Sequence, residues 1–143
     1  MADITVTAAN VRPLNGAIVR RGEAGGSGSV GNLVYLAGTD GWKQADADAS
    51  QAAAMGRGIV VAVGSEGATT FADGDKVDIV VFGPVEGAAS MTPGATVYNS
   101  STAGAVADAA PAETGDDWDF IVGWAESASV IFVHPQTTVP SAT

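Results

Sequence analysis

Two short runs in this chain have the composition of a site for an ion or a phosphate group. In the first, Asp46, Asp48 and Ser50 resemble the opening ligands of a calcium-binding loop, in which alternate oxygen-bearing side chains hold the ion. Such a loop also needs a glycine at its sixth position and a glutamate at its twelfth, where this chain has Gln51 and Arg57. We therefore expect a solvated loop here and no metal ion.

The second run, Gly26, Gly28 and Gly31, has the G-x-G-x-x-G spacing of a phosphate-binding loop. That role requires a strand before the glycines and the amino-terminal end of a helix after them. Here a strand-like segment follows the glycines instead. The sequence therefore predicts a flexible Gly/Ser-rich hinge over residues 23–31, with no bound cofactor.

The other chemically active side chains are isolated. His134 stands beside Pro135 without a serine and an aspartate that the sequence assigns to it, which favours packing at a strand end over catalysis. Asp116, Asp117 and Asp119 are typical of an exposed turn. The chain has one histidine and no cysteine, so it offers neither a thiolate nor a multi-histidine metal centre. We expect the protein not to be an enzyme.

Three tryptophans remain as candidates for binding. Trp42, Trp118 and Trp124 suit a platform on which sugar rings stack, and they also suit anchors of a core or of a subunit interface. Because only 6% of the residues are aromatic, we favour the second interpretation.

Composition favours a protein that packs against other subunits. The 143 residues are enough for one domain, and charged residues make up 15% of them, against about 25% in ordinary globular domains. A weakly charged surface of this kind is typical of a subunit, so we expect a homo-oligomer, with a trimer as the first choice. No run of 18 apolar residues occurs, and we expect no membrane span.

The charge is distributed unevenly along the chain. Residues 1–22 contain Arg12, Arg20 and Arg21 against Asp3 alone, which gives them a net charge of about +2. Because the whole chain has a net charge of −10, the remaining residues carry about −12. A body this acidic repels phosphate backbones, so we expect no binding to nucleic acid.

The elements that must position these residues are strands. β-branched and aromatic runs bounded by Gly, Pro or Asp predict strands, and Asp73-Gly74 is a hairpin signal. We expect strands near residues 3–8, 16–21, 32–37, 42–45, 57–63, 76–83, 85–90, 95–99, 104–107, 119–126 and 129–134, and one short helix over residues 50–55. Eleven short strands in one domain predict an all-β barrel or sandwich.

The second half of the chain repeats the first at low resolution. Val34-Tyr35 and Val97-Tyr98 open the two copies, and each is followed by an Ala/Asp tract. The offset of 63 between residues 34 and 97 also relates GIVVA, from residue 58, to IVGWA, from residue 121. IVVFGP, from residue 79, is then matched by VIFVHP, from residue 130, after a shorter loop. We predict a duplicated domain whose halves, around residues 32–84 and 95–135, close on one core.

Residues 1–22 are expected to form an N-terminal arm outside the core. Together with the hinge over 23–31, a β domain over 32–136 and a flexible tail over 137–143, this gives the predicted organisation. The arm would reach a neighbouring subunit or a larger assembly, add a strand there and place its arginines on acidic groups. Its candidate contact residues are Ile4, Val6, Val11, Arg12, Arg20 and Arg21. The alternative is that residues 4–11 are the first strand of the same barrel.

The order of these motifs resembles the small capsid-decoration proteins of tailed phages, also called cement or head-stabilising proteins. It runs from VYL and KQADADASQAAAMGRGIVVA through a Gly/Asp hairpin and VDIVVFGPV to GATVY, AGAVADAAPA and IVGWA. The resemblance covers roughly residues 30–135, with a looser match in residues 4–11. Arg57 departs from the usual pattern, and residues 82–91 are generic, which leaves the contacts with the shell unassigned.

The resemblance implies a compact β-barrel or β-tulip fold without catalytic residues. It also implies a homotrimer that is made in the host cytoplasm, binds the major capsid protein on the outer surface of the virion and stabilises the mature head. The alternative is a β-rich module of a head or tail fibre that binds a host-surface glycan through its tryptophans.

Overall fold

The computed structural model describes residues 3–64, 67–110 and 118–136 of the chain. Within these ranges the protein is all-β, with short strands, one short α-helix and two single turns of 3₁₀-helix, at Ala8–Asn10 and Gly38–Asp40. The predicted tail, residues 137–143, and the predicted turn at Asp116 and Asp117 lie outside the described residues.

Most of the strands fall where the sequence pattern predicts them. The strands are β1 (Thr5–Val6), β2 (Arg12–Pro13), β3 (Ile18–Glu23), β4 (Gly28–Ser29), β5 (Leu33–Leu36), β6 (Trp42–Gln44), β7 (Gly58–Val63), β8 (Thr70–Phe71), β9 (Lys76–Glu86), β10 (Ala88–Ala89), β11 (Thr96–Asn99), β12 (Val106–Ala107), β13 (Ile121–Ala125) and β14 (Val130–Val133). The helix, α1 (Gln51–Ala54), lies inside the range expected for it, and the Ser50 side chain caps it by accepting a hydrogen bond from the Ala53 N–H. One expectation needs correction. The expected boundary between the strands over 76–83 and 85–90 is wrong, because β9 runs on through Gly83 and Pro84 to Glu86 and leaves only Ala88–Ala89 for β10.

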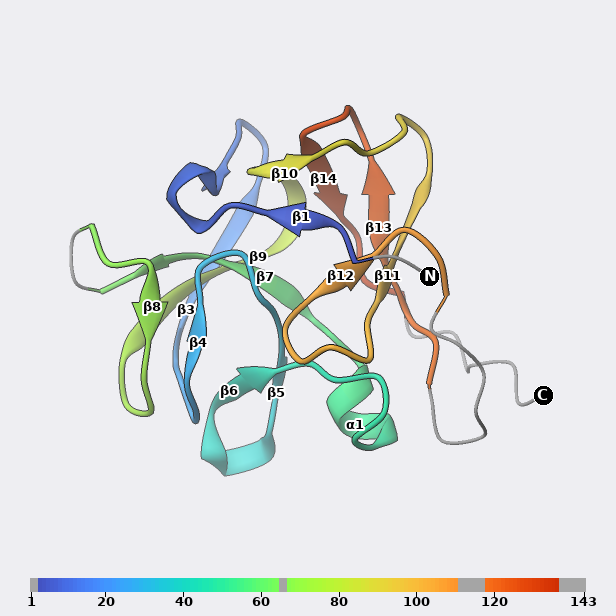
Figure 1. Ribbon diagram of the computed structural model, residues 1–143. Helices are drawn as coiled ribbons and strands as arrows, with labels where there is room; N and C mark the ends of the chain where they lie inside the picture. Colours follow the sequence, from blue (N-terminus) through green and yellow to red (C-terminus); the bar gives the residue numbers. More distant parts are fainter. Residues whose placement is uncertain (1–2, 65–66, 111–117, 137–143) are drawn as a thin grey trace.

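The main sheet repeats one neighbour order in its two halves. Eight antiparallel strands follow one another as β12-β11-β13-β14-β9-β7-β5-β6 and curl into a half-barrel (Figure 1). The first half of the chain contributes β6-β5-β7-β9 and the second contributes β12-β11-β13-β14, so corresponding strands have corresponding neighbours. Val34 and Val97 lie on corresponding strands and both are fully buried. The topology is the one that the 63-residue offset predicts.

The two halves differ in register at one place. Val34 pairs with Gly58, whereas Val97 pairs with Gly123 and the next residue, Tyr98, pairs with Ile121. A β-bulge between Val97 and Tyr98 changes the register of the second pair by one residue, because it places an extra residue on one strand. The two halves therefore have the same order of strands, but the residues that pair across corresponding strands differ slightly.

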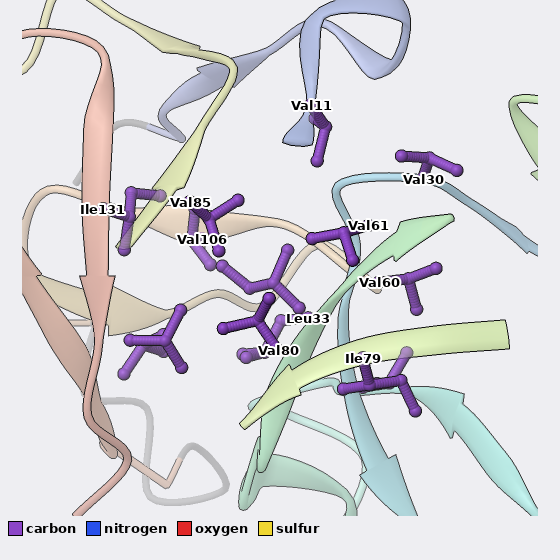
Figure 2. Packing of buried hydrophobic residues seen from close by; sticks show 14 of the residues in the cluster. Val11, Val30, Leu33, Val60, Val61, Ile79, Val80, Val85, Val106 and Ile131 are labelled. Carbon is purple, nitrogen blue, oxygen red and sulfur yellow. The ribbon is translucent and has the colours of Figure 1, made fainter. Parts of the chain in front are cut away.

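The core is built mainly by β5, β7 and β9, which are buried on both faces. Leu33 pairs with Ile59 and Ile59 with Val80, which puts these three side chains in one row on one face of the sheet. Val60 pairs with Ile79 on the opposite face. Figure 2 shows Leu33 and Val80 on the side of Val85, farther along β9, and of Val106 of the second half, while Val60 and Ile79 lie apart from them. The halves therefore share a single apolar core.

The N-terminal residues do not form a separate arm in this chain. β2 and β3 pair with β9, and β1 pairs with β10. Backbone hydrogen bonds therefore attach this segment to the domain of its own chain. Val11 is buried in the core, and Ile4 and Val6 pack against it. The physical reason lies in β9, whose eleven residues present two edges of N–H and C=O groups that need partners. The alternative interpretation, in which these residues begin the same barrel, describes the structure better.

The glycine-rich hinge is likewise an ordered part of the fold. Ala24 is buried and bridges to Trp42, Gly25 donates its N–H to the Trp42 carbonyl at 2.8 Å, and β4 pairs with β8. A Cβ at Gly25 would collide with the carbonyl oxygen of Asp40. The glycines are thus present because strands approach one another closely here. From composition alone, the same glycines predict a flexible segment.

Candidate interaction surface

The residues first considered for chemistry do not assemble into a chemical site. Asp46 turns back on its own loop, where its carboxylate accepts a hydrogen bond from the Asp48 N–H at 3.3 Å. His134 packs its ring edge-to-face against Phe82, with the centroids 5.4 Å apart, at the end of a strand as expected. No group of three or more metal-ligating side chains occurs among the described residues. No helix in that part of the chain is long and apolar enough to cross a membrane.

The three tryptophans lie in different parts of the fold and do not form one platform. Trp42, on β6, covers Gly22, where an added Cβ would collide with the indole. Trp118 is held by its backbone, which donates to the Ala47 carbonyl and accepts from the Asn99 side chain. Trp124, on β13, is 41% exposed. Only this third tryptophan presents a large part of its ring to solvent.

Trp124 belongs to a continuous apolar strip on the outer face of the sheet. Its ring stacks on Phe132 of β14 with the centroids 5.1 Å apart, and Phe132 meets Phe82 of β9 edge-to-face at 5.2 Å. Ile18 of β3 pairs with Phe82 and extends the strip to a fourth strand. Phe82 is 39% exposed and Ile18 52%. We call Ile18, Phe82, Phe132 and Trp124 the aromatic row.

The alternation of side chains along the strands puts the aromatic row outside. On β14, Ile131 and Val133 are buried in the core, so Phe132 between them points to the other face. On β13, Gly123 and Ala125 face inward, and Trp124 lies opposite Phe132 on the outer face. The row is therefore fixed by the same period of two that fills the core.

An outer face of this kind is suited to contact with another protein. Stacked and edge-to-face aromatic rings hold one another in place, so little conformational entropy is lost when a partner covers them. Contiguous exposed apolar side chains on a soluble domain are a common mark of an interaction site, and aromatic residues often dominate the binding energy of such interfaces.

The predicted arm residues divide into two groups. Among the apolar ones, Val11 is part of the core, and Ile4 and Val6 pack against it, whereas the three arginines are exposed. Two of these arginines already have intramolecular partners on β9.

Arg12 donates from Nε to Glu86 at 2.9 Å, and Arg21 donates from Nε and Nη2 to Asp78 at 2.9 and 3.2 Å. The hydrogen bond and charge of Arg12 lower the pKa of Glu86 below its ordinary value, although water screens the pair because both side chains are exposed. Arg20 has no ion pair within the described ranges. The structure therefore leaves Arg20 as the arginine available to a partner.

Comparison with protein-family models, with characterised proteins and with solved structures gave no match.

The sequence interpretation missed Phe82, Phe132 and Ile18 as parts of one surface. A signal was present in VIFV, where alternation sends Phe132 to the face opposite Ile131 and Val133. In VVFG strict alternation would put Phe82 on the face of Val80, and the register shift between β3 and β9 changes this. The sequence could not show that the three strands are neighbours, because Ile18 and Phe132 lie more than a hundred positions apart.

Proposed function

We propose that the protein is a capsid-decoration protein of a tailed phage, which binds the outside of the head as a homotrimer and stabilises the mature shell. The observation that carries the proposal is the aromatic row, a preformed apolar surface on a β domain. The order of sequence motifs, which resembles that of capsid-decoration proteins, supports it independently. In this proposal the protein is structural and acts by binding.

The aromatic row is the surface that faces the shell. Trp124 and Phe132 supply large, rigid contact area at one end of the row, and Phe82 and Ile18 extend that area toward β3. Many copies bound around one head act together, so a modest contact in each copy gives firm attachment of the layer.

Cosedimentation with heads of the phage that encodes the chain, freed of their own decoration layer, tests the proposal. We expect the wild-type protein to bind and Trp124→Ser to lose about tenfold or more in affinity, the size of effect seen for a central aromatic contact. Leu36→Ser is the matched control, since Leu36 is 54% exposed but lies outside the row, and this variant should bind like the wild type. Failure of the wild type to bind heads would overturn the function. Normal binding by Trp124→Ser would overturn the role of the row.

The trimer has a separate test. Light scattering of the purified protein at micromolar concentration should give three times the mass of the chain, because a weakly charged surface of this composition is stabilised by contact between subunits. A monomer under these conditions would contradict this part of the proposal.

A second candidate function rests on the exposed ring of Trp124. A tryptophan stacked on Phe132 offers a flat apolar surface of the kind on which sugar rings stack, as a fibre module that binds host glycans would need. Binding of an oligosaccharide that Trp124→Ser abolishes, together with no binding to heads, would favour this function over decoration.

A further inference from the structure

The first four residues of β3 lie along an open edge of the sheet. On one side β3 pairs with β9, in register from Ile18 opposite Phe82 to Glu23 opposite Lys76. On its other side, the described part of the chain makes a strand contact only beyond the end of β3, where Ala24 bridges to Trp42. The segment 18–21, which we call the β3 edge, therefore has no strand beside it, and all four of its residues are exposed.

Hydrogen bonds near the end of β3 define which backbone groups face outward. Ala24 donates its N–H to the Asp75 carbonyl and accepts from the Gly74 N–H, both at 2.8 Å, so its backbone groups point toward the β9 side. Because residues of an antiparallel strand alternate, Arg20 also turns its backbone toward β9. Val19 and Arg21 turn their N–H and C=O groups to the open edge, where they are ready to pair with an added strand.

The side chains along this edge define the charge of the strand that fits. Arg20 is exposed and has no ion pair among the described residues, and the Arg21 guanidinium beside it is exposed although it binds Asp78. The remainder of the chain is acidic. The β3 edge is thus a local positive region, and an extended segment that carries carboxylates complements it.

A second copy of the chain fits this edge poorly. Two copies of β3 paired antiparallel, with Val19 opposite Arg21, would place Arg20 opposite Arg20, and like charges in directly opposed positions are destabilising. The end strands of the main sheet, β6 and β12, offer no acidic residue either, and β6 carries Lys43. The charge pattern therefore favours a different protein as the partner.

We infer that the β3 edge binds an extended acidic segment of another protein, which joins the sheet as a strand beside Val19 and Arg21. Ile18 belongs both to this edge and to the aromatic row, so an apolar side chain of the added strand packs against Ile18, which lies beside Phe82. The inference goes beyond the proposed function and does not depend on it, since it follows from the edge and its charge alone.

Nuclear magnetic resonance of the full chain, titrated with model peptides, tests this inference. The first probe is a hexapeptide of alternating glutamate and valine. The second replaces each glutamate with lysine, and the third keeps the glutamates but carries methyl groups on alternate backbone nitrogens, which prevents pairing along one edge. We expect saturable shifts centred on the amides of Val19 and Arg21 with the first probe alone, and slower hydrogen exchange at both amides.

Two variants separate charge from fold. Arg20→Ala should weaken binding of the glutamate probe by about fivefold, the upper end for one exposed charge contact, while Lys43→Ala removes the same charge elsewhere and should leave binding unchanged. Equal binding of the methylated or lysine probes, or shifts located away from the β3 edge, would overturn the inference. No binding of any probe would show that the charges only protect a bare edge. Protection of Val19 and Arg21 that rises with protein concentration alone would identify a second copy as the occupant.

Discussion

The two halves of the sheet have the same strand order but differ in what covers their outer faces. In the first half, β5, β7 and the part of β9 before Phe82 bury residues on both faces, and β3 pairs with β9. In the second half, β13 and β14 bury one face in the shared core, and the other face carries the exposed Trp124 beside the buried Val122. In the sequence, the 63-residue offset aligns Val61, which is 7% exposed, with Trp124, which is 41% exposed, although the pairing registers of the two halves differ.

This difference shows how the two copies of a duplicated β unit can take different roles, one in the core and one in a contact surface. A valine is sufficient where the face is covered, whereas an aromatic side chain at the corresponding open position extends a contact surface without altering the inward-facing residues. The first half thus provides most of the core, and the second provides Trp124 and Phe132, the stacked pair of the aromatic row. The predictions that follow test this division with pairs of corresponding or matched positions.

The largest effect is expected at Leu33, which corresponds to Thr96 in the second half. Leu33→Ala removes a fully buried side chain from the row shared with Ile59 and Val80, so the free energy of unfolding should fall by about 2–5 kcal/mol. Thr96→Ala, at a half-buried position, should change it by less than about 1 kcal/mol. Urea denaturation of both variants checks this, and equal losses would contradict the division.

The next effect concerns Asn99, whose counterpart in the first half is Leu36. The fully buried Asn99 amide donates to the carbonyls of Ala54 and Trp118 at 3.0 and 2.7 Å and accepts from the Phe120 N–H at 3.0 Å. Asn99→Ala leaves these backbone groups unsatisfied and should cost about 2–3 kcal/mol of unfolding free energy.

Leu36→Ala is the control for that variant and should shift the unfolding free energy by about 0.5 kcal/mol at most, because Leu36 is mainly exposed. Thermal and chemical denaturation should agree on the order of the two variants. A loss in Leu36→Ala as large as that in Asn99→Ala would show that the hairpin of the first half is not peripheral.

A smaller effect is expected at Gly83, where β9 passes from its pairing with β7 to its pairing with β14. Its φ of +113° is unfavourable for other residues, and a Cβ there would lie 2.7 Å from the Cα of Ala17. Gly83→Ala should therefore cost about 1–3 kcal/mol. Gly74→Ala has a similar φ of +94° but open space around it, and it should cost less. A reversed order in denaturant would contradict the importance of this joint.

The smallest effect is expected from the pair of Arg12 and Glu86. Arg12 lowers the pKa of Glu86 in the folded state, so the pair contributes stability above the ordinary carboxylate pKa and loses it as the pH falls through the lowered value. Glu86→Gln should be slightly less stable than the wild type near neutral pH and equal to it in acid or at high salt. A difference that grows on acidification would contradict this sign.

The strand pattern could be predicted from the sequence because period-two alternation and turn residues are local signals. The short strands β2, β4 and β8 were missed, since two residues carry no period and their pairing depends on distant partners. The Gly-rich segment was misinterpreted for a related reason. Gly25 is required by the approach of the Asp40 carbonyl, a contact that no local pattern reveals.

The candidate surface was predictable only in part. The arginines were identified as exposed residues near the N-terminus, but their partners on β9 were not, because the register between β3 and β9 is a tertiary property. Trp124 was recognised as a possible anchor, whereas its stacking on Phe132 depends on how β13 and β14 pair.

The central claim is that the aromatic row joins the protein to a phage head. A density map of the decorated head, at a resolution that traces strands, tests this most directly. We expect the outer face of β9, β13 and β14 to lie against the shell, with Trp124 and Phe132 covered by the major capsid protein. A map in which these rings face solvent, or in which the domain is absent from the head, would contradict the account.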